Sequence, residues 1–306
     1  MTSIVIAAHN ESAVLGRCLD SLLAGMAPGE FDVTVVANGC TDATAQVATA
    51  RPGVRVLDLP AAGKVAALNA GDTVALGFPR VYLDADIAIS ADGIRALRAA
   101  LSDVGLSSAK ALAATPRREL DVSRSPFLVR AYFAINSRLP VFRNALFGRG
   151  VIALSAEGRS RFGQFPDLVA DDLFLDSLFT ATEKREVESV SVQVAAPRRT
   201  RDLLRRLVRV RRGNATIRAA LAADPGFRGE APTSDRASWL RDVALRNPSL
   251  LPAAACYAVI TLTAATLARL PGQSGDGWGR DNSSRQDDRQ AGDMEASNLD
   301  ASDGRR

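Results

Sequence analysis

Short apolar runs alternate with helical patterns through the first 101 residues, and this alternation constrains the fold more than any other feature of the chain. The apolar runs cover 3–8, 31–37, 54–59 and 80–86. Each is followed by residues whose apolar side chains recur at helical spacing. Strands that alternate with helices in this way predict an α/β fold, with a mostly parallel sheet and helices on both of its faces.

Polar residues gather where these strands are expected to end. In sheets of this kind, ligands bind beyond the carboxyl ends of the strands. The residues that fall at that edge are Glu11, Asn38, Gly63, Lys64, Asp84 and Asp86. Helix caps are also expected in these loops, from Asn10 for the first helix and from Thr41 or Asp42 for the second.

The run that ends in "LDAD" places Asp84 and Asp86 at the tip of the fourth strand. In an extended chain residues two apart point the same way, so both carboxylates are expected to face one spot. A hard divalent cation bridged to a substrate diphosphate would remove their mutual repulsion. A turn or helix-cap pair is the alternative, because short D-x-D matches are common. Lys64, at the preceding strand–helix junction, favours a diphosphate site.

Composition excludes several kinds of site. His9 is the only histidine, so a Ser-His-Asp triad or a histidine-rich metal site is hard to build. Cys18, Cys40 and Cys256 have neither paired nor metal-ligand spacing, which indicates a reducing compartment. The first residues lack the basic leader and the longer apolar core of a signal peptide, so we expect a cytoplasmic protein.

Beyond residue 101 the pattern is less regular. Helical patterns are expected over 125–139 and 166–179, and strands over 145–155 and 186–196. A basic helix is expected over 198–214, with Arg201, Arg205, Arg209 and Arg212 on one face and Leu203, Leu207 and Val210 on the other.

The segments "SIVIAAHNES", "VVANGCTDATAQVA", "GKVAALNAG" and "YLDADI", followed by "GRGVIALS" and "VADDLF", occur in an order and spacing that resembles the family 2 glycosyltransferases. The resemblance extends over about 1–214. It implies the GT-A fold, a nucleotide-diphosphate-sugar donor such as a UDP- or GDP-sugar, a Mg²⁺ or Mn²⁺ ion, and inversion at the anomeric carbon in one displacement.

The resemblance also implies roles for single residues. On the donor side, the backbone near Ala8 and the side chain of Glu11 would line the nucleotide pocket. Asn38 stands where the family usually has an aspartate that reads the base, which leaves the base open. Lys64 would neutralise donor phosphate, Asp84 would lie near ribose or metal, and Asp86 would be the principal metal ligand.

On the acceptor side, the resemblance assigns the catalytic base to "ADD". Asp172 would take the proton of the acceptor hydroxyl, a role that typically contributes 10²–10⁴-fold. Asp171 beside it is the second candidate catalytic residue, and the alternative for it is an acidic first helical turn that complements the helix dipole. Gly148, Arg149 and Gly150 lie where the family places glycines beneath the acceptor, and Arg149 is a candidate acceptor contact.

The segment "RRLVRVRRG" resembles the Q-x-x-R-W-x-x-G segment of processive synthases in this family, with Arg206, Arg209 and Gly213 in register. Val210 replaces the tryptophan, which favours a non-processive enzyme. Arg206 and Arg209 are predicted donor contacts, and Arg209 is preferred for the leaving diphosphate. A basic helix on an anionic membrane surface is an alternative that is compatible with this role. No aromatic residues interleave with the arginines, so no nucleic-acid partner is expected.

The chain is uncharged over 247–268, a segment that reaches the length of a membrane span but is rich in Ala and Thr and contains Pro252. We expect membrane association of some kind, at the cytoplasmic face, without deciding whether the segment spans. The expected organisation is a catalytic domain over 1–230, a helical extension over 231–271 and a disordered polar tail over 272–306.

The expected function is transfer of a sugar to a glycan or lipid-linked acceptor, in cell-surface polysaccharide or glycolipid synthesis. One alternative is a haloacid dehalogenase-type phosphatase, which also places D-x-D after a strand. Ala88 and the position after the fourth strand do not fit that class. A membrane-bound scaffold with a decayed site is the other alternative, and the intact set of carboxylates argues against it.

Overall fold

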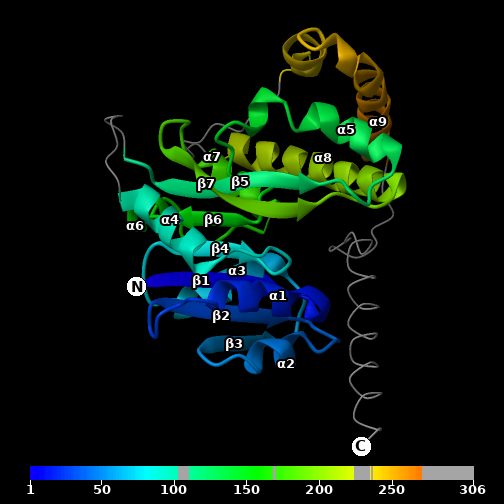
Figure 1. The fold of residues 1–306 in the computed structure, drawn as a ribbon. Coiled ribbons are helices and arrows are strands. Elements are labelled where there is room, and N and C mark those ends of the chain that lie inside the picture. The colour runs from blue at the N-terminus through cyan, green and yellow to red at the C-terminus, as the bar shows by residue number, and fades with distance from the viewer. Residues whose placement is uncertain (103–109, 168–169, 224–234, 236, 271–306) are drawn as a thin grey trace, which may run out of the picture.

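The computed structural model describes residues 1–102, 110–167, 170–223, 235 and 237–270. Within this part of the chain, seven strands form one sheet in the order β3-β2-β1-β4-β6-β5-β7 (Figure 1). β6 is antiparallel to both of its neighbours, and every other neighbouring pair is parallel. The strands are β1 (Thr2–Ala8), β2 (Phe31–Asn38), β3 (Val54–Leu59), β4 (Arg80–Asp84), β5 (Ala113–Asp121), β6 (Val151–Leu154) and β7 (Lys184–Ala195).

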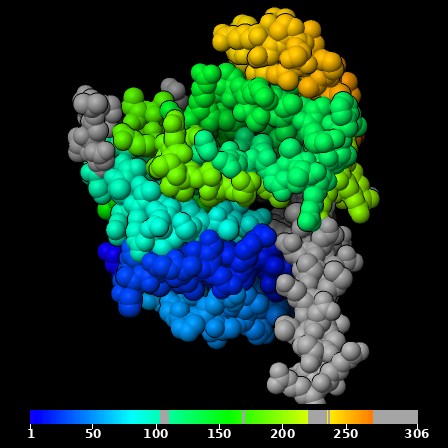
Figure 2. Space-filling model, in the orientation of Figure 1, coloured from blue at the N-terminus to red at the C-terminus, as the bar shows by residue number. Residues whose placement is uncertain are grey.

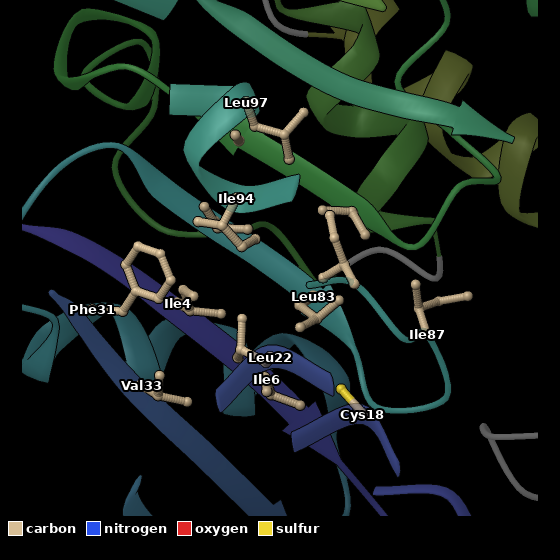
Figure 3. Close-up of a cluster of buried hydrophobic side chains, with 14 of the residues drawn as sticks. Ile4, Ile6, Cys18, Leu22, Phe31, Val33, Leu83, Ile87, Ile94 and Leu97 are labelled. Atoms are coloured by element: carbon tan, nitrogen blue, oxygen red, sulfur yellow. The ribbon is translucent and has the colours of Figure 1, made fainter. Parts of the chain in front are cut away.

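Helices cover both faces of this sheet. They are α1 (Ser12–Leu23), α2 (Thr44–Thr49), α3 (Lys64–Val74), α4 (Ala91–Ser102), α5 (Phe127–Asn136), α6 (Ala156–Arg159), α7 (Asp171–Ser177), α8 (Thr200–Ala223) and α9 (Leu251–Arg269), with the shorter η1 (Pro140–Phe142), η2 (Trp239–Ala244) and η3 (Pro248–Leu250). Along β1, Ile4 and Ile6 pack with α1 and α4, whereas Val5 packs with α3 on the opposite face (Figure 3). The predicted mostly parallel α/β sheet with helices on both faces is therefore confirmed.

The C-terminal helices share a third apolar cluster with the rest of the molecule. Tyr132 of α5 stacks on Tyr257 of α9 with ring centroids 5.1 Å apart, and Leu203 of α8 is buried in the same cluster. Figures 1 and 2 show α9, in orange, lying against this end of the molecule. The predicted helical extension is thus packed onto the catalytic part. The predicted tail over 272–306 lies outside the described residues.

One strand was not predicted from the sequence. β5 lies between β6 and β7 in the sheet, but its sequence "AATPRRELD" contains a proline and four charged residues. Its pairing with β7 is interrupted by a bulge between Pro116 and Arg117. A proline cannot donate to the ladder, so in a strand it is usually found at a bulge or an edge.

The predicted cap of the first helix is wrong, whereas Asp42, one of the two caps predicted for the second helix, does bond to its start. Asn10 does not cap α1, because its backbone has a φ of 53° and its Oδ1 accepts a hydrogen bond from Thr41 N at 2.7 Å. The carboxylate of Asp42 bonds to the first residue of both α1 and α2: it accepts hydrogen bonds from Ser12 N at 3.2 Å and from Thr44 N at 3.0 Å. One carboxylate therefore fixes α1 and α2 together.

The close approach of α3 to β1 gives a test of this packing. A Cβ on Gly71 would collide with Cγ1 of Val5, and Val36 Cγ2 would lie at 3.2 Å. We expect Gly71→Ala to lower the free energy of unfolding by about 1–3 kcal/mol, because the overpacking outweighs the gain in helix propensity. Gly163→Ala is the control, because nothing lies within 4 Å of its Cβ. Urea denaturation measures both, and equal stabilities of the two variants would contradict the packing described.

Candidate active site

Three parallel strands bring their polar ends to one edge of the sheet. Ala8 is level with Ala37 of β2, and Ala7 is level with Asp84 of β4. Asn38 and Asp84 are the last residues of their strands. The predicted convergence of these ends is therefore observed.

Lys64 connects this edge to the start of α7. It is the first residue of α3, and its Nζ lies 2.9 Å from Asp84 Oδ1 and 3.0 Å from Asp171 Oδ2. Burial disfavours the ammonium ion, but the charges of Asp171 and Asp84 outweigh it and hold the pKa of Lys64 well above its usual value. The lysine is therefore a fixed positive charge between two carboxylates.

Asp171 is the more perturbed of the two carboxylates. Burial, together with the nearby Asp172 and Asp84, raises its pKa to about 6, although Lys64 opposes the rise. The side chain is mostly covered and its Oδ2 is committed to Lys64. This geometry favours a positioning role for Asp171, which keeps Lys64 at the sheet edge.

Asp84 and Asp86 do not lie in one extended segment as predicted. β4 ends at Asp84, and Ile87 N donates to Asp84 O at 3.1 Å, so Asp86 lies in the turn that follows. Asp86 is exposed, and the side chain of Asp84 is 44% exposed. Burial raises the pKa of the Cys18 thiol to about 12, and the charges of Asp86 and Asp84 add to the rise.

A glycine turn joins Asp84 to Asp172. Gly150 O accepts from Asp84 N at 2.8 Å, and Gly148 N donates to Asp172 Oδ2 at 2.9 Å. Both glycines have left-handed φ angles, 72° and 69°, and a Cβ on Gly150 would lie 3.1 Å from Asp84 Oδ2. The turn that contains Arg149 therefore needs glycine at both ends, and it places the predicted catalytic base beside the predicted metal ligand.

Comparison with known proteins identifies the class of this site. Residues 3–125, which include Lys64, Asp84 and Asp86, match the model of glycosyl transferase family 2. The chain carries a family 2 glycosyltransferase domain. It is a glycosyltransferase, and the phosphatase alternative is wrong, because its D-x-D belongs to this domain.

Solved structures support the same fold. A mannosyltransferase from Pyrobaculum calidifontis, solved with GDP-Man and Mn²⁺, is 22% identical over 87% of this chain and 78% of that chain, with a TM-score of 0.54. A glucosyl-3-phosphoglycerate synthase from M. tuberculosis is 24% identical over 72% of this chain and 80% of that chain, with a TM-score of 0.49. The first of these likenesses confirms the predicted GT-A fold. No curated protein sequence matches the chain.

In the glycosyltransferase domain, the side chain of Asn38 holds strand ends together. It is fully buried, donates to Ala8 O at 2.7 Å and accepts from Gly63 N at 3.0 Å. His9 Nδ1 lies 2.6 Å from Asn38 O. Glu11 is buried at the start of α1, and its N–H donates to Thr44 Oγ1 at 2.8 Å. Asn38 therefore shapes the predicted nucleotide pocket by fixing Ala8 and the start of α3.

Arg149 points into the protein and not toward the open side of the turn. Its side chain is 5% exposed, and its guanidinium bonds to Ala145 O at 2.7 Å, Phe142 O at 2.9 Å and Glu186 Oε2 at 2.6 Å. These contacts tie the glycine turn to β7. The geometry favours a structural role over the predicted acceptor contact.

Asp176 is a supporting residue that sequence reasoning missed. It is buried in α7, and its Oδ1 accepts from Leu146 N at 2.7 Å and lies 3.0 Å from Lys184 Nζ. It therefore holds the segment before the glycine turn against the helix that carries Asp172. Its spacing from Asp172, one helical turn, was the signal available in the sequence.

Two arginines of the basic helix α8 bond to the backbone at α9, a contact that the sequence did not predict. Arg211 donates to Thr261 O at 3.3 Å, and Arg212 donates to Leu270 O at 2.9 Å, so both bond to the backbone at α9. Val210 is 43% exposed and does not belong to the buried face. Arg206 and Arg209, the predicted donor contacts, are partly buried in the same helix.

Proposed function

We propose that the enzyme transfers a sugar from a UDP- or GDP-sugar to a hydroxyl of a glycan or lipid-linked acceptor, with inversion and with one residue added per encounter. The observation that carries this proposal is the placement of Lys64, Asp84 and Asp172 around one glycine turn. A fixed cation and exposed carboxylates suit a metal-bound diphosphate, and a carboxylate beside them suits a general base.

The carboxylates of Asp84 and Asp86 fit a Mg²⁺ or Mn²⁺ ion. No group of three or more metal-ligating side chains occurs in the described part of the chain. Mg²⁺ sites of phosphoryl substrates typically use one or two carboxylates and complete the shell with phosphate oxygens and water. When bound, the ion would neutralise charge that develops on the leaving diphosphate.

Asp172 is proposed as the base. Its carboxylate accepts the proton of the acceptor hydroxyl while that oxygen forms a bond to the anomeric carbon and the bond to the diphosphate oxygen breaks. The electron pair of the broken bond leaves with the nucleoside diphosphate. Lys64 is placed to stabilise that negative charge, and Arg209 is the proposed contact from α8.

A thermal-shift screen of nucleotide sugars, with and without Mn²⁺, tests the proposal. We expect a UDP- or GDP-sugar to raise the melting temperature only when the metal is present, because the carboxylates need the ion to accept a diphosphate. EDTA should reverse the shift. A metal-independent shift, or none with any nucleotide sugar, would contradict the proposed donor site.

The enzyme is also proposed to act at the cytoplasmic face of a membrane. Among the described residues, one helical segment, Pro248–Arg269, is long and apolar enough to cross a membrane. Tyr257, Ile260 and Ala264 are buried against the domain, whereas Val259 and Leu262 are 64% and 67% exposed. This one-sided packing supports a helix that lies in the membrane interface with its outer face in lipid.

Replacement of the outer face tests the membrane proposal. We expect Val259→Gln combined with Leu262→Gln to reduce binding to anionic phosphatidylglycerol vesicles by more than about tenfold, because two apolar side chains lose their lipid contact. Leu76→Gln is a matched control, since Leu76 is 66% exposed and lies outside α9. Co-sedimentation measures the bound fraction. Equal binding by the double variant and the control would rule out α9 as the lipid contact.

A further inference from the structure

Arg118 lies against the glycine turn on the side of Asp172. It follows the β5 bulge, and its guanidinium carbon lies 4.4 Å from the centre of the Phe142 ring. A Cβ built on Gly148 would be 3.3 Å from an Arg118 terminal nitrogen. Gly148 is also the residue whose N–H binds Asp172. Arg118 therefore lies at the same glycine that binds the proposed base, although no sequence motif marked it.

Arg118 and Arg206 have little negative charge around them: among the described residues, Glu186 is the carboxylate whose charge favours the Arg118 guanidinium, and Arg149 already forms an ion pair with it. The neighbouring Arg149 is paired with Glu186 at 2.6 Å, but neither Arg118 nor Arg206 has an ion pair or a hydrogen bond there. Burial, together with the charges of Arg149 and Arg206, lowers the pKa of Arg118 to about 10. Grouped cations of this kind cost free energy unless an anion binds.

The glycine turn separates this pair of arginines from the donor side. Gly150 packs on Asp84, where the diphosphate is proposed to bind, whereas Gly148 packs on Arg118. Asp172, which must contact the acceptor hydroxyl, is bound to the Gly148 end. An anion held by Arg118 would therefore belong to the acceptor and not to the donor.

We propose that Arg118, with Arg206, binds a phosphate group on the acceptor and so presents the acceptor hydroxyl to Asp172. This inference rests on the proposed function. A phosphate monoester carries a charge of about −1.5 to −2 at neutral pH, which matches two guanidinium groups better than a single carboxylate does. The guanidinium fork also matches phosphate oxygens geometrically.

Direct binding tests the proposal without knowledge of the natural acceptor. Calorimetry with glycerol 3-phosphate measures a soluble phosphate monoester, and co-sedimentation with phosphatidic acid vesicles measures the same headgroup on a lipid. We expect Arg118→Gln and Arg206→Gln each to weaken binding to at least one of these probes by about tenfold or more. If only the binding to vesicles is weakened, the acceptor phosphate belongs to a lipid. If the binding to glycerol 3-phosphate is weakened, it belongs to a soluble acceptor.

Arg117→Gln is the matched control, because Arg117 is the adjacent residue but is exposed and paired with Glu119 at 2.7 Å. The Mn²⁺-dependent thermal shift with UDP and with GDP reports the donor side separately, and Arg118→Gln should retain it. If that shift is absent in the unaltered enzyme, the proposed function fails. The binding measurements with glycerol 3-phosphate and phosphatidic acid still test whether Arg118 binds phosphate. If Arg118→Gln and Arg206→Gln bind both phosphate probes as tightly as Arg117→Gln does, the proposal is overturned. A parallel loss of nucleotide and phosphate binding in both arginine variants would overturn the acceptor assignment.

Discussion

Replacement of Asp172 with Asn is expected to lower kcat by about 10²-fold or more while donor binding is retained. The amide cannot accept the acceptor proton, but its oxygen can still accept the hydrogen bond from Gly148 N–H, which Asp172 Oδ2 now accepts at 2.9 Å. The turn should therefore keep its shape. The loss would appear in the chemical step and not in assembly of the site.

Release of nucleoside diphosphate from the donor identified by thermal shift measures this turnover. Asp92→Asn is the control, because the side chain of Asp92 is 88% exposed and lies on α4. Asp171→Asn provides a second comparison. This substitution removes the charge that pairs with Lys64 and should therefore weaken donor binding. Asp172→Asn should leave donor binding unchanged. Near-normal turnover of Asp172→Asn would remove Asp172 from the mechanism.

Replacement of Asp86 with Ala is expected to abolish metal-dependent donor binding. Loss of an outer-shell partner alone typically costs 10–100-fold in metal affinity, so loss of a proposed ligand should exceed about 100-fold. Asp86 is exposed at the turn after β4, so the substitution should leave the fold intact. The expected defect is thus specific to the ion and the diphosphate.

Calorimetry with UDP or GDP and Mn²⁺ measures this effect, with Asp92→Ala as the control. Unfolding by urea should give the same stability for Asp86→Ala as for the unaltered enzyme. If Asp86→Ala binds the nucleotide in a Mn²⁺-dependent manner with unchanged affinity, Asp86 is not a metal ligand.

The part of the fold that follows from periodicity could be predicted from the sequence. β1 to β4 and their helices were recognisable because each strand is a short segment rich in apolar residues. β5 was not, because a strand that contains Pro116 and charged residues has no such run. Its burial is confined to Ala113–Pro116, before the bulge. Sheet position, and not local propensity, decides its structure.

In the candidate site, too, some residues could be placed from the sequence and others could not. Residues at strand ends, such as Lys64 and Asp84, could be placed because parallel strands end at one edge. The roles of Arg149 and Arg118 could not be predicted, because their environments depend on β5 and β7, whose paired residues, such as Ala113 and Lys184, lie about 70 positions apart in the sequence. Arg149, within the motif, forms an ion pair with Glu186, whereas Arg118, outside it, forms none among the described residues. Only the tertiary structure distinguishes them.

Arg212 joins the middle of α8 to the C-terminal end of α9. Its guanidinium lies on carbonyl oxygens of Leu267, Ala268 and Leu270, which an isolated helix would leave without partners. Arg211 donates to Thr261 O in the same way, so α8 and α9 are held together at two points. A displacement of α9 would therefore also displace α8, the helix that carries Arg206.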